Sequence, residues 1–506
     1  MSRLFVRKPL GQLLSEASES EKGLKRTLSA GSLVALGIGA IIGAGLFVRT
    51  AAAAGAHAGP AVTLSFIIAA IGCALAGLCY AEFASMIPIA GSAYTYSYAT
   101  LGELVAWIIG WDLVLEYALG AATVSIGWSQ YLNNLLNTLF HVTIPFEWSH
   151  SPFQVSDAGV HGIINLPAIF ILLLLTLLLI KGTQESALVN TIIVIVKVAI
   201  VLLFIALGWQ FMNPANHTPY MIPADAGVVH MNDGSNVDYS LARNHGWIGV
   251  LAGAGVVFFA FIGFDAVSTA AQETKNPKKA MPIGILVSLA ICTVLYILFS
   301  HVLTGVAPYK DFLKAGSEAS VAYAINTYMP GYGWLSLFIT IAILAGFSSV
   351  ILVMLLGQTR VFYSMSNDGL VPPVFSKLHP KHRTPYKSQW MFFVFTALFA
   401  GFVPDHIVGD MTSIGTLFAF VLVCIGVLVM RKTNPEVPRP FKTPLVPFVP
   451  IAGALVCLAM IAGLGLGNWT RLIIWLAIGF VIYFGYSVKH SKARKLQAKG
   501  ELQEQQ

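Results

Sequence analysis

Long apolar runs, separated by short polar segments, follow one another along the chain. About 20 consecutive apolar residues are enough for a helix to cross the hydrocarbon core of a bilayer. A dozen stretches reach or approach that length, some of them across a turn. They cover residues 33–54, 61–86, 104–132, 163–180, 187–208, 248–271, 281–303, 334–357, 389–403, 407–430, 447–467 and 470–487. This pattern predicts an all-α polytopic membrane protein with 12 transmembrane helices.

The first of these stretches is unusually rich in glycine. It reads LVALGIGAIIGAGLFVRTAAAA from Leu33 to Ala54, with glycine at positions 37, 39, 43 and 45. Each glycine in a helix interior costs about 1 kcal/mol relative to alanine. One interpretation is that the glycines let a neighbouring helix approach closely. The other is a helix broken in mid-membrane, which is tolerated where the freed backbone groups are buried in protein or line a cavity.

The sixth stretch repeats this character and favours the second interpretation. Gly253, Gly255 and Gly263 interrupt its apolar run, and Asp265 follows directly. Because it comes five crossings after the first stretch, the two run in opposite directions across the membrane. Glycine-broken spans at matching positions of two oppositely oriented halves are typical of the binding site of a secondary transporter.

Such breaks favour a ligand that carries both a negative and a positive group. The amides at a half-helix N-terminus attract an anion such as a carboxylate. Carbonyls freed by the unwinding can accept hydrogen bonds from an ammonium group. An α-amino acid presents both groups a few ångströms apart, so we expect an amino acid site with a separate pocket for the side chain.

Composition supports a membrane protein and excludes other classes. Of the 506 residues, 56% are hydrophobic and 10% are charged, against about 25% charged in a soluble domain. Lys and Arg gather in the segments that a cytoplasmic N-terminus would place inside, so the positive-inside rule predicts that both termini are cytoplasmic. The net charge of +7 is therefore a topology signal, and we expect no nucleic-acid binding. The basic tail after residue 487 is expected to contact lipid headgroups.

The sequence lacks the motifs of a cofactor-dependent or ATP-driven protein. GIGAIIGAG has neither the spacing nor the strand–helix context of a dinucleotide fingerprint, and there is no Walker motif. The five cysteines lie in apolar runs without zinc-site spacing, so we expect neither disulfides nor a metal site. The N-terminal segment does not read as a cleaved signal peptide. With no obvious nucleophile–base pair either, we expect no cofactor and no enzymatic activity.

Ionisable residues inside the apolar stretches are candidates for ion coupling, because they are costly in a bilayer and mark functional pathways. Lys197 lies about 15 Å into the fifth stretch at 1.5 Å per residue. Burial favours the neutral form of an amine, so this lysine could carry a coupled proton; the alternative is a static ion pair. Asp112 and Glu116 are one helical turn apart in the third stretch. Glu116 could pair with Lys197 or relay protons, Asp112 could equally be structural, and Asp265 could cap the inner half-helix.

Five longer segments carry a family resemblance. They are GIGAIIGAGLFV (37–48), HAGPAVTLSF (57–66), YAEFASMIPIAGSAYTYSYATLGEL (80–104), FFAFIGFDAVSTAAQETKNPKKAMPIGI (258–285) and GQTRVFYSMSNDGLVPPVF (357–375). With them the chain resembles the amino acid–polyamine–organocation (APC) superfamily, and within it the bacterial homologues of the cationic amino acid transporters. The resemblance covers nearly all of residues 25–487.

The resemblance implies a leucine-transporter-like 5+5 inverted repeat followed by two further helices. The expected parts are a cytoplasmic N-terminal segment (1–32), a first five-helix repeat (33–208), an extracellular loop (209–247), a second, inverted five-helix repeat (248–430), two additional transmembrane helices (431–487) and a cytoplasmic tail (488–506).

The resemblance also implies roles for individual residues. The substrate carboxylate would meet amides of the first stretch, and its α-ammonium would meet carbonyls of the first and sixth. The implied amides are those of Gly43, Ala44 and Gly45, and the implied carbonyls are those of Ile41, Phe259, Ala260 and Ile262. Lys197 stands where sodium-coupled relatives hold a sodium ion, which favours proton coupling, with Glu116 and Asp265 as further candidates. Ser348 and Ser349 fall in the region that faces the substrate side chain.

The sequence therefore predicts a secondary active transporter in the cell membrane that takes up L-amino acids with protons by alternating access. Alanine-like and cationic substrates such as arginine or lysine both stay open, because no acidic residue clearly marks the side-chain pocket. A proton-independent exchanger or facilitator is the alternative within transport, and a non-transporting amino acid sensor is the alternative from another class. Expected partners are the amino acid, the proton and the lipid bilayer, with room for a small single-span membrane subunit.

Overall fold

The computed structural model of the protein describes residues 5–9, 11–13, 15, 24–43, 45–156, 159–230, 236–314, 320–463 and 466–498. These residues are mostly helical, which confirms an all-α polytopic membrane protein. Within the described ranges, 8 helical stretches are long and apolar enough to cross a membrane, and shorter apolar helices accompany them. Each apolar stretch predicted from the sequence overlaps one or more helices among the described residues.

The helices follow one another with few interruptions, and the η elements are 3-10 or π-helical turns. The first part of the chain forms α2 (Ala30–Ile41), η2 (Gly45–Arg49), α3 (Thr50–Ala53), η3 (Ala54–Ala58), η4 (Gly59–Ala61), α4 (Val62–Met86), α5 (Ala93–Thr100), α6 (Glu103–Val114), η5 (Leu115–Leu119), α7 (Gly120–Phe140), α8 (Phe146–Ser149), α9 (Leu166–Lys181) and α10 (Thr183–Gly208). The connection that follows contains η6 (Trp209–Phe211), η7 (Pro214–His217), β1 (Val228–His230), β2 (Asn236–Asp238) and η8 (Ala242–Asn244). The second part forms α11 (Gly246–Phe258), η9 (Phe259–Phe261), η10 (Asp265–Glu273), α12 (Pro277–Val306), α13 (Tyr309–Lys314), α14 (Ser320–Tyr328), α15 (Gly333–Asn367), η11 (Pro373–Ser376), α16 (Tyr386–Phe402), α17 (Asp405–Thr433), α18 (Phe448–Gly463), α19 (Leu466–Ile482), η12 (Tyr483–Ser487), α20 (Val488–His490) and α21 (Lys492–Ala498).

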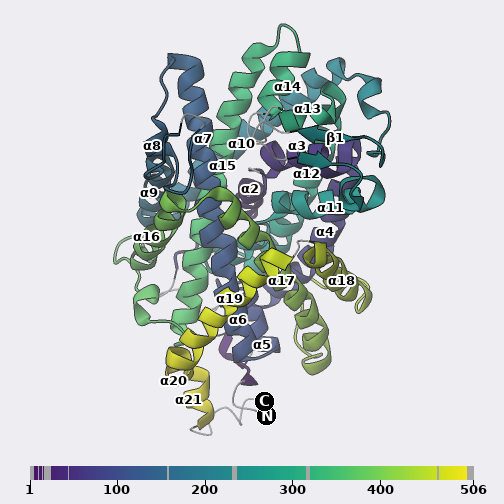
Figure 1. Ribbon diagram of the computed structural model, residues 1–506. Helices are drawn as coiled ribbons and strands as arrows, with labels where there is room; N and C mark the ends of the chain where they lie inside the picture. Colours follow the sequence, from purple (N-terminus) through teal and green to yellow (C-terminus); the bar gives the residue numbers. More distant parts are fainter. Residues whose placement is uncertain are drawn as a thin grey trace.

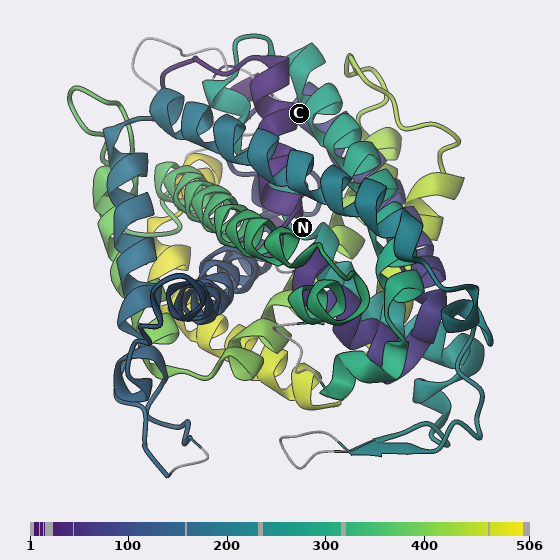
Figure 2. The ribbon, with the colours of Figure 1, turned by 90° about the horizontal axis from the view of Figure 1, so that it is seen from above.

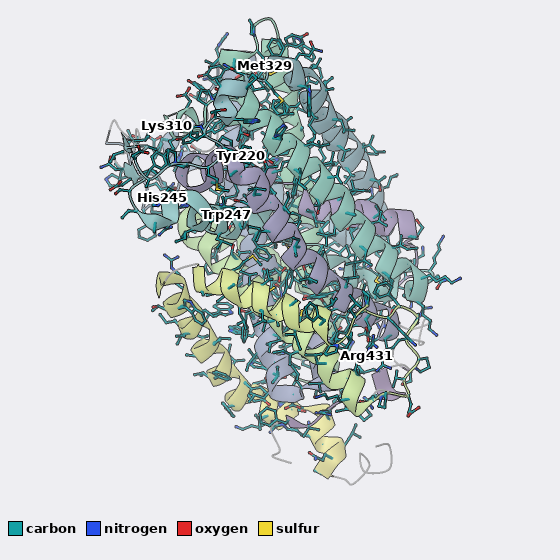
Figure 3. All side chains as sticks on the ribbon, turned by 90° about the vertical axis from the view of Figure 1, so that its right-hand side faces the viewer. Tyr220, His245, Trp247, Lys310, Met329 and Arg431 are labelled. Atoms are coloured by element: carbon teal, nitrogen blue, oxygen red, sulfur yellow. The ribbon has the colours of Figure 1, made fainter. Side chains whose placement is uncertain are left out.

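The molecule has two distinct ends. Helices α20 and α21 lie at one end, and α8, α13, α14 and β1 lie at the other (Figure 1). A side view shows the same division, with Tyr220, His245 and Lys310 toward one end and Arg431 toward the other (Figure 3). We call the end with α20 and α21 the terminal end, and the end with β1 and α13 the loop end.

Helix α15 runs through the middle of the molecule. Figure 2, viewed from above, shows it crossing the centre with other helices around it. It packs against α2, α7 and α10, and most of its side chains are buried. Helix α2 in turn is held between α10, α12 and α15. The core therefore lies where the first stretch of the chain is enclosed by the later ones.

Buried charges fasten the terminal end. Among the described residues, five ion pairs link residues far apart in the sequence: Lys8 with Asp368, Glu82 with both Arg431 and Arg439, Glu103 with Arg494, and Glu273 with Arg360. The pair between Glu273 and Arg360 is fully buried, with an N–O distance of 2.8 Å. These pairs connect α4 with α17, η10 with α15, and both ends of the described chain with the rest of the bundle.

The connection after α10 is an ordered cover on the loop end. Strands β1 and β2 pair antiparallel, with Val229 opposite Val237. The hydroxyl of Tyr239 donates to the carbonyl of Gly55 at 2.7 Å, and Lys310 Nζ donates to the carbonyl of Ala226 at 2.8 Å. The described part of this connection is thereby attached to the segment that continues the first span.

Candidate functional site

The first span is broken in its middle. Helix α2 ends at Ile41, and Ile42 is extended, with φ −79° and ψ 101°. The chain resumes as the π-helical turn η2 at Gly45 and continues through α3. Ala44, an expected amide donor, lies outside the described residues. The break therefore lies between Ile41, the last residue of α2, and Gly45, the first residue of η2. It falls within the glycine-rich segment that the sequence analysis identified.

The sixth span is broken as well. Helix α11 ends at Phe258, a 3-10 turn covers Phe259–Phe261, and Ile262 is extended with ψ 135°. Gly263 follows with φ +107°, a conformation that residues with a Cβ rarely adopt. A second 3-10 segment, η10, then begins at Asp265. Both broken spans thus interrupt their helices where the glycine pattern predicted an interruption.

The two breaks touch each other. A Cβ placed on Gly45 would lie 2.1 Å from the Cα of Ala260, so only glycine allows this approach. A Cβ on Gly43 would lie 2.5 Å from a methyl carbon of Val350 in α15. The close-packing and broken-helix interpretations of the first span therefore both apply: the glycines permit close contact at the place where the helices are interrupted.

Carbonyls at the breaks are engaged by two side chains from other helices. The last carbonyls of a helix have no partner within it. At the end of α2, Lys197 takes the carbonyls of Gly39 and Ile42. The hydroxyl of Tyr296 lies 2.6 Å from the carbonyl oxygen of Ile41 and 2.8 Å from that of Ala260.

Lys197 is fully buried and stands at the C-terminal end of α2. Its Nζ donates to the carbonyls of Gly39 at 3.0 Å and Ile42 at 2.7 Å, and to the hydroxyl of Ser349 at 2.7 Å. All three acceptors are neutral, and no carboxylate of the described residues pairs with this lysine. The negative end of the helix dipole stabilises a cation at this place. Among the described residues, Lys197 is therefore bound by the C-terminal end of α2 and by Ser349, and not by a carboxylate. Glu116 is not its hydrogen-bond or ion-pair partner in this structure.

Ser349 lies next to this lysine. Its hydroxyl is 2.8 Å from the carbonyls of both Gly39 and Gly346. Ser348, its neighbour in α15, is half-buried and donates to the carbonyl of Leu344 in its own helix. Of these two serines, it is thus Ser349 that reaches the first break.

Two of the candidate carboxyl groups lie near the second break. Glu116 and Asp265 are both fully buried and close enough to interact electrostatically, but neither oxygen of Glu116 has a hydrogen-bond partner among the described residues. A hydrogen bond between the two carboxyl groups would require a proton on one of them. The hydroxyl of Tyr117 donates to Asp265 Oδ2 at 2.5 Å. Glu116 and Tyr117 belong to the π-helical turn η5, a feature often found at functional sites.

Asp112 and Asp265 have different surroundings in the structure. Neither carboxylate oxygen of Asp112 has a hydrogen-bond partner among the described residues, although the side chain is fully buried. It lies against α17, where a Cβ on Gly415 would be 3.0 Å from Asp112 Oδ1. Asp265 is the first residue of η10, where a negative charge is favourable, and its oxygen Oδ2 is bound by Tyr117.

A cation covers the breaks on the side of the loop end. The guanidinium carbon of Arg49 lies 5.2 Å from the ring centre of Phe259. Both side chains are half-buried. Arg49 ends η2 and Phe259 begins η9, so this contact links the two broken spans beside their breaks. No pattern in the sequence pointed to it.

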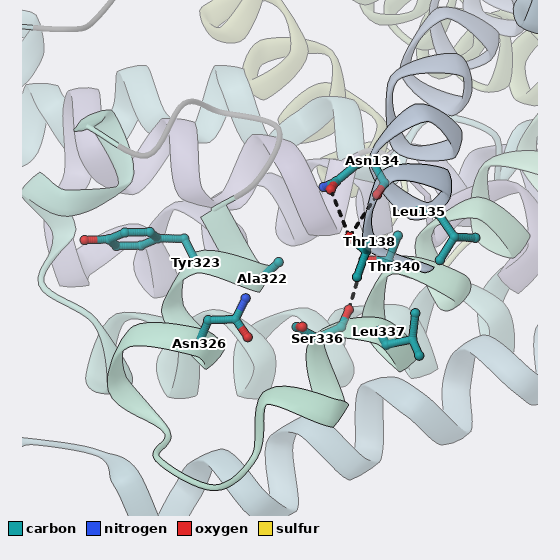
Figure 4. Close-up of a pocket in the computed structure, with 9 residues that line it drawn as sticks. All are labelled: Asn134, Leu135, Thr138, Ala322, Tyr323, Asn326, Ser336, Leu337 and Thr340. Atoms are coloured by element: carbon teal, nitrogen blue, oxygen red, sulfur yellow. Dashed lines mark hydrogen bonds between the residues drawn. The ribbon is translucent and has the colours of Figure 1, made fainter. Parts of the chain in front are cut away.

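The described residues also contain a cavity elsewhere. It has a volume of about 290 Å³ and lies between α7, α14 and α15 (Figure 4). Its polar groups are partly engaged within their own helices, since Thr138 donates to the carbonyl of Asn134 and Thr340 to that of Ser336. It contains none of the expected site residues. The described part of the chain also holds no group of three or more His, Cys, Asp or Glu that could bind a metal, and its cysteines are buried free thiols.

Comparisons with known proteins bear on what this arrangement does. A family model described as "Amino acid permease" matches residues 28–486. The chain is 46% identical over 489 residues to the branched-chain amino acid permease BcaP of Bacillus subtilis (strain 168), covering 97% of this chain and 98% of that protein. It is 43% identical to the methylthioribose transporter of the same organism, over 98% of this chain and 100% of that one. It is 34% identical to the vacuolar cationic amino acid transporter 4 of Arabidopsis thaliana, over 86% of this chain and 68% of that one.

Proposed function

Because the chain belongs to the amino acid permease family, we propose that it is a proton-coupled transporter that takes up an L-amino acid across the cell membrane by alternating access. The observation that carries this proposal is the contact between the two helix breaks, where Gly45 lies against Ala260. Interrupted helices that meet inside a membrane protein expose backbone groups where a substrate can use them. The proposed layout is 12 transmembrane helices, with the five-plus-five inverted repeat before the last two and both termini in the cytoplasm.

Backbone groups of the two breaks would bind the parts that all amino acids share. The carboxylate would meet the amides of residues 43–45. The α-ammonium would meet carbonyls contributed by both breaks, namely those of Ile41, Phe259, Ala260 and Ile262. The contact between the breaks supports this, because it places acceptors from opposite halves of the chain within reach of one small ligand.

The proton would be carried by the buried ionisable groups around the breaks. Lys197 has only neutral partners, so its charge is not cancelled by a carboxylate of the described residues. Its loss of a proton would leave two N–H groups for three acceptors and would remove the positive charge at the end of α2, which would weaken the contacts that hold the first break. Glu116 and Asp265 would form the second element, because two neighbouring buried carboxyls repel each other when both are ionised, which favours a proton on one of them.

The relatives suggest which side chains to test first. They include a permease of branched-chain amino acids and a transporter of cationic ones. We propose amino acids with small or branched neutral side chains, such as alanine and valine, ahead of arginine and lysine. The higher identity to the branched-chain permease, 46% against 34% for the cationic transporter, supports this order.

A methylthioribose-like substrate is the second candidate. It is favoured by the relative of that name, which this chain matches at 43% identity over its whole length. A thio-sugar has neither a carboxylate nor an ammonium group. It would therefore leave the amide and carbonyl contacts of the proposed site without charged partners.

The test has a binding arm and a transport arm. In the first, thermal unfolding of purified protein is followed with alanine, valine, arginine, lysine and methylthioribose, since a ligand that binds the folded state raises its apparent stability. In the second, uptake of the labelled compounds is measured in proteoliposomes with and without an inward proton gradient. We expect stabilisation by neutral amino acids and accumulation only with the gradient.

The outcomes separate the alternatives. Uptake that ignores the gradient and requires amino acid on the opposite side indicates an exchanger, and downhill flux alone indicates a facilitator. Binding with no flux in either direction indicates a sensor. Stabilisation by methylthioribose alone refutes the amino acid assignment.

A further inference from the structure

Tyr296 connects the two helix breaks. It lies on α12 and its side chain is fully buried. Its ring packs against Phe66 and Phe261, with ring centres 5.3 Å and 5.2 Å away. Its hydroxyl oxygen is 2.6 Å from the carbonyl oxygen of Ile41 and 2.8 Å from that of Ala260. The two aromatic neighbours fix the ring, so the position of the hydroxyl is well determined.

The two acceptors belong to opposite halves of the chain. Ile41 is the last residue of α2, and Ala260 lies in the turn that follows α11. A tyrosine hydroxyl has a single proton to donate, so it must be shared between them or alternate from one to the other. Two carbonyl oxygens pointing at the same place repel each other, and a donor between them stabilises their convergence. Tyr296 therefore holds together two groups that would otherwise separate.

We infer that Tyr296 is a positioning residue for the α-ammonium group of the substrate: its hydroxyl holds the carbonyls of Ile41 and Ala260 converged on one point. This inference rests on the proposed function, because it specifies how the proposed ammonium site is kept in shape. Each carbonyl oxygen has two lone pairs, so both can accept from an ammonium while Tyr296 remains bound. Because the hydroxyl is uncharged, its burial in the empty site does not require the desolvation of a charge. It aligns the two carbonyls before the ligand binds.

The perturbation is Tyr296→Phe, with Tyr80→Phe as the matched control. Tyr80, on α4, is also fully buried, but its hydroxyl has no hydrogen-bond partner among the described residues. Both variants remove one buried oxygen from an aromatic ring of the same helical bundle. Only the first removes a donor from the breaks.

The first measurement needs no ligand. Hydrogen exchange of the backbone amides in residues 38–48 and 256–266 is followed by mass spectrometry in detergent or nanodiscs. Loss of one hydrogen bond to a buried acceptor should speed exchange at both breaks by about tenfold in Tyr296→Phe. Tyr80→Phe should exchange at the wild-type rate.

The second measurement compares ligands with and without the amino group. Binding of L-alanine and L-valine is measured beside binding of propionate and isovalerate, which are the same acids without it. In Tyr296→Phe the apparent Kd of the two amino acids should rise by about tenfold. The weak binding of propionate and isovalerate should stay within twofold of wild type, and Tyr80→Phe should leave all four unchanged.

Each outcome decides the matter. Faster exchange at both breaks together with a selective loss of amino acid affinity supports the inference. Unchanged exchange overturns it, as does faster exchange with unchanged affinity, which would make the hydroxyl a structural tie alone. If wild type binds none of the four acids yet Tyr296→Phe loosens both breaks, the proposed function fails and the tie between the breaks stands without a role in recognition.

Discussion

The contact between Gly45 and Ala260 can be tested by adding a single methyl group. In Gly45→Ala the new Cβ would lie 2.1 Å from the Cα of Ala260, 2.5 Å from its Cβ and 2.7 Å from its nitrogen. Carbon atoms pack at about 3.5–4.0 Å, so the two breaks must move apart by roughly 1.5 Å. The nearest atom is backbone, which cannot rotate out of the way. Overpacking of this kind costs about 1–3 kcal/mol.

The expected result is a protein that folds but recognises its substrate poorly. Gly45→Ala should reduce amino acid uptake in proteoliposomes at least tenfold, mainly through KM, because carbonyls and amides from the two breaks no longer converge on one ligand. Gly255→Ala is the control. A Cβ on Gly255 meets nothing within 4 Å, and alanine stabilises a helix interior by about 1 kcal/mol over glycine. Wild-type KM in Gly45→Ala would refute the reasoning, as would an equal loss in both variants.

Three further perturbations address the other parts of the site. Lys197→Met keeps the length of the side chain but removes the donors to the end of α2, so uptake should no longer respond to an imposed pH gradient; gradient-driven accumulation at the wild-type level would remove Lys197 from the coupling. Arg49→Gln removes a cation–π contact worth about 0.5–2 kcal/mol, so the bound amino acid should dissociate about two- to thirtyfold faster toward the loop end, and an unchanged dissociation rate contradicts a closing role for Arg49 over Phe259. Arg360→Met removes the cation that lies 2.8 Å from the buried carboxylate of Glu273 and should cost about 3–5 kcal/mol of stability; adding Glu273→Gln should recover most of the loss in a thermal unfolding assay, and no recovery would mean that the charge of Glu273 was not the cause.

Several features of the fold could be predicted because they depend on the local sequence alone. Glycine density marks the places where a helix is interrupted or closely approached, and both breaks lie where this pattern predicted them. The apolar stretches marked the helices, because length and hydropathy alone decide whether a helix suits a bilayer. The position of Lys197 well inside a long helix, α10, also followed from counting residues along one of these stretches.

The partners of the buried groups could not be predicted in the same way. Lys197 binds backbone carbonyls, which every residue carries, so no sequence signal points to Gly39 or Ile42. Tyr296 looked like an aromatic residue in an apolar span, and nothing in the sequence distinguishes it from Tyr80. Only the folded arrangement of α2, α11 and α12 shows which hydroxyl has acceptors.

The environment of Glu116 shows how a local irregularity changes a reasonable expectation. Counting along a regular α-helix places Glu116 one turn beyond Asp112 and at the depth of Lys197. The structure contains a π-helical turn over Leu115–Leu119, which inserts an extra residue into the turn. With this insertion Glu116 and Tyr117 meet Asp265 on the second broken span.

The two candidate proton sites are therefore attached to different breaks. Lys197 acts on the first break through the carbonyls that end α2, where a positive charge is stabilised by the helix dipole. In the proposed mechanism, Glu116 would act on the second through Asp265, the residue that begins η10. A proton gained or lost at either place would change the interactions at one end of a half-helix, and the contact between Gly45 and Ala260 would transmit that change to the other break. Coupling between proton and substrate then requires no direct contact between them, only two half-helices that cannot move independently.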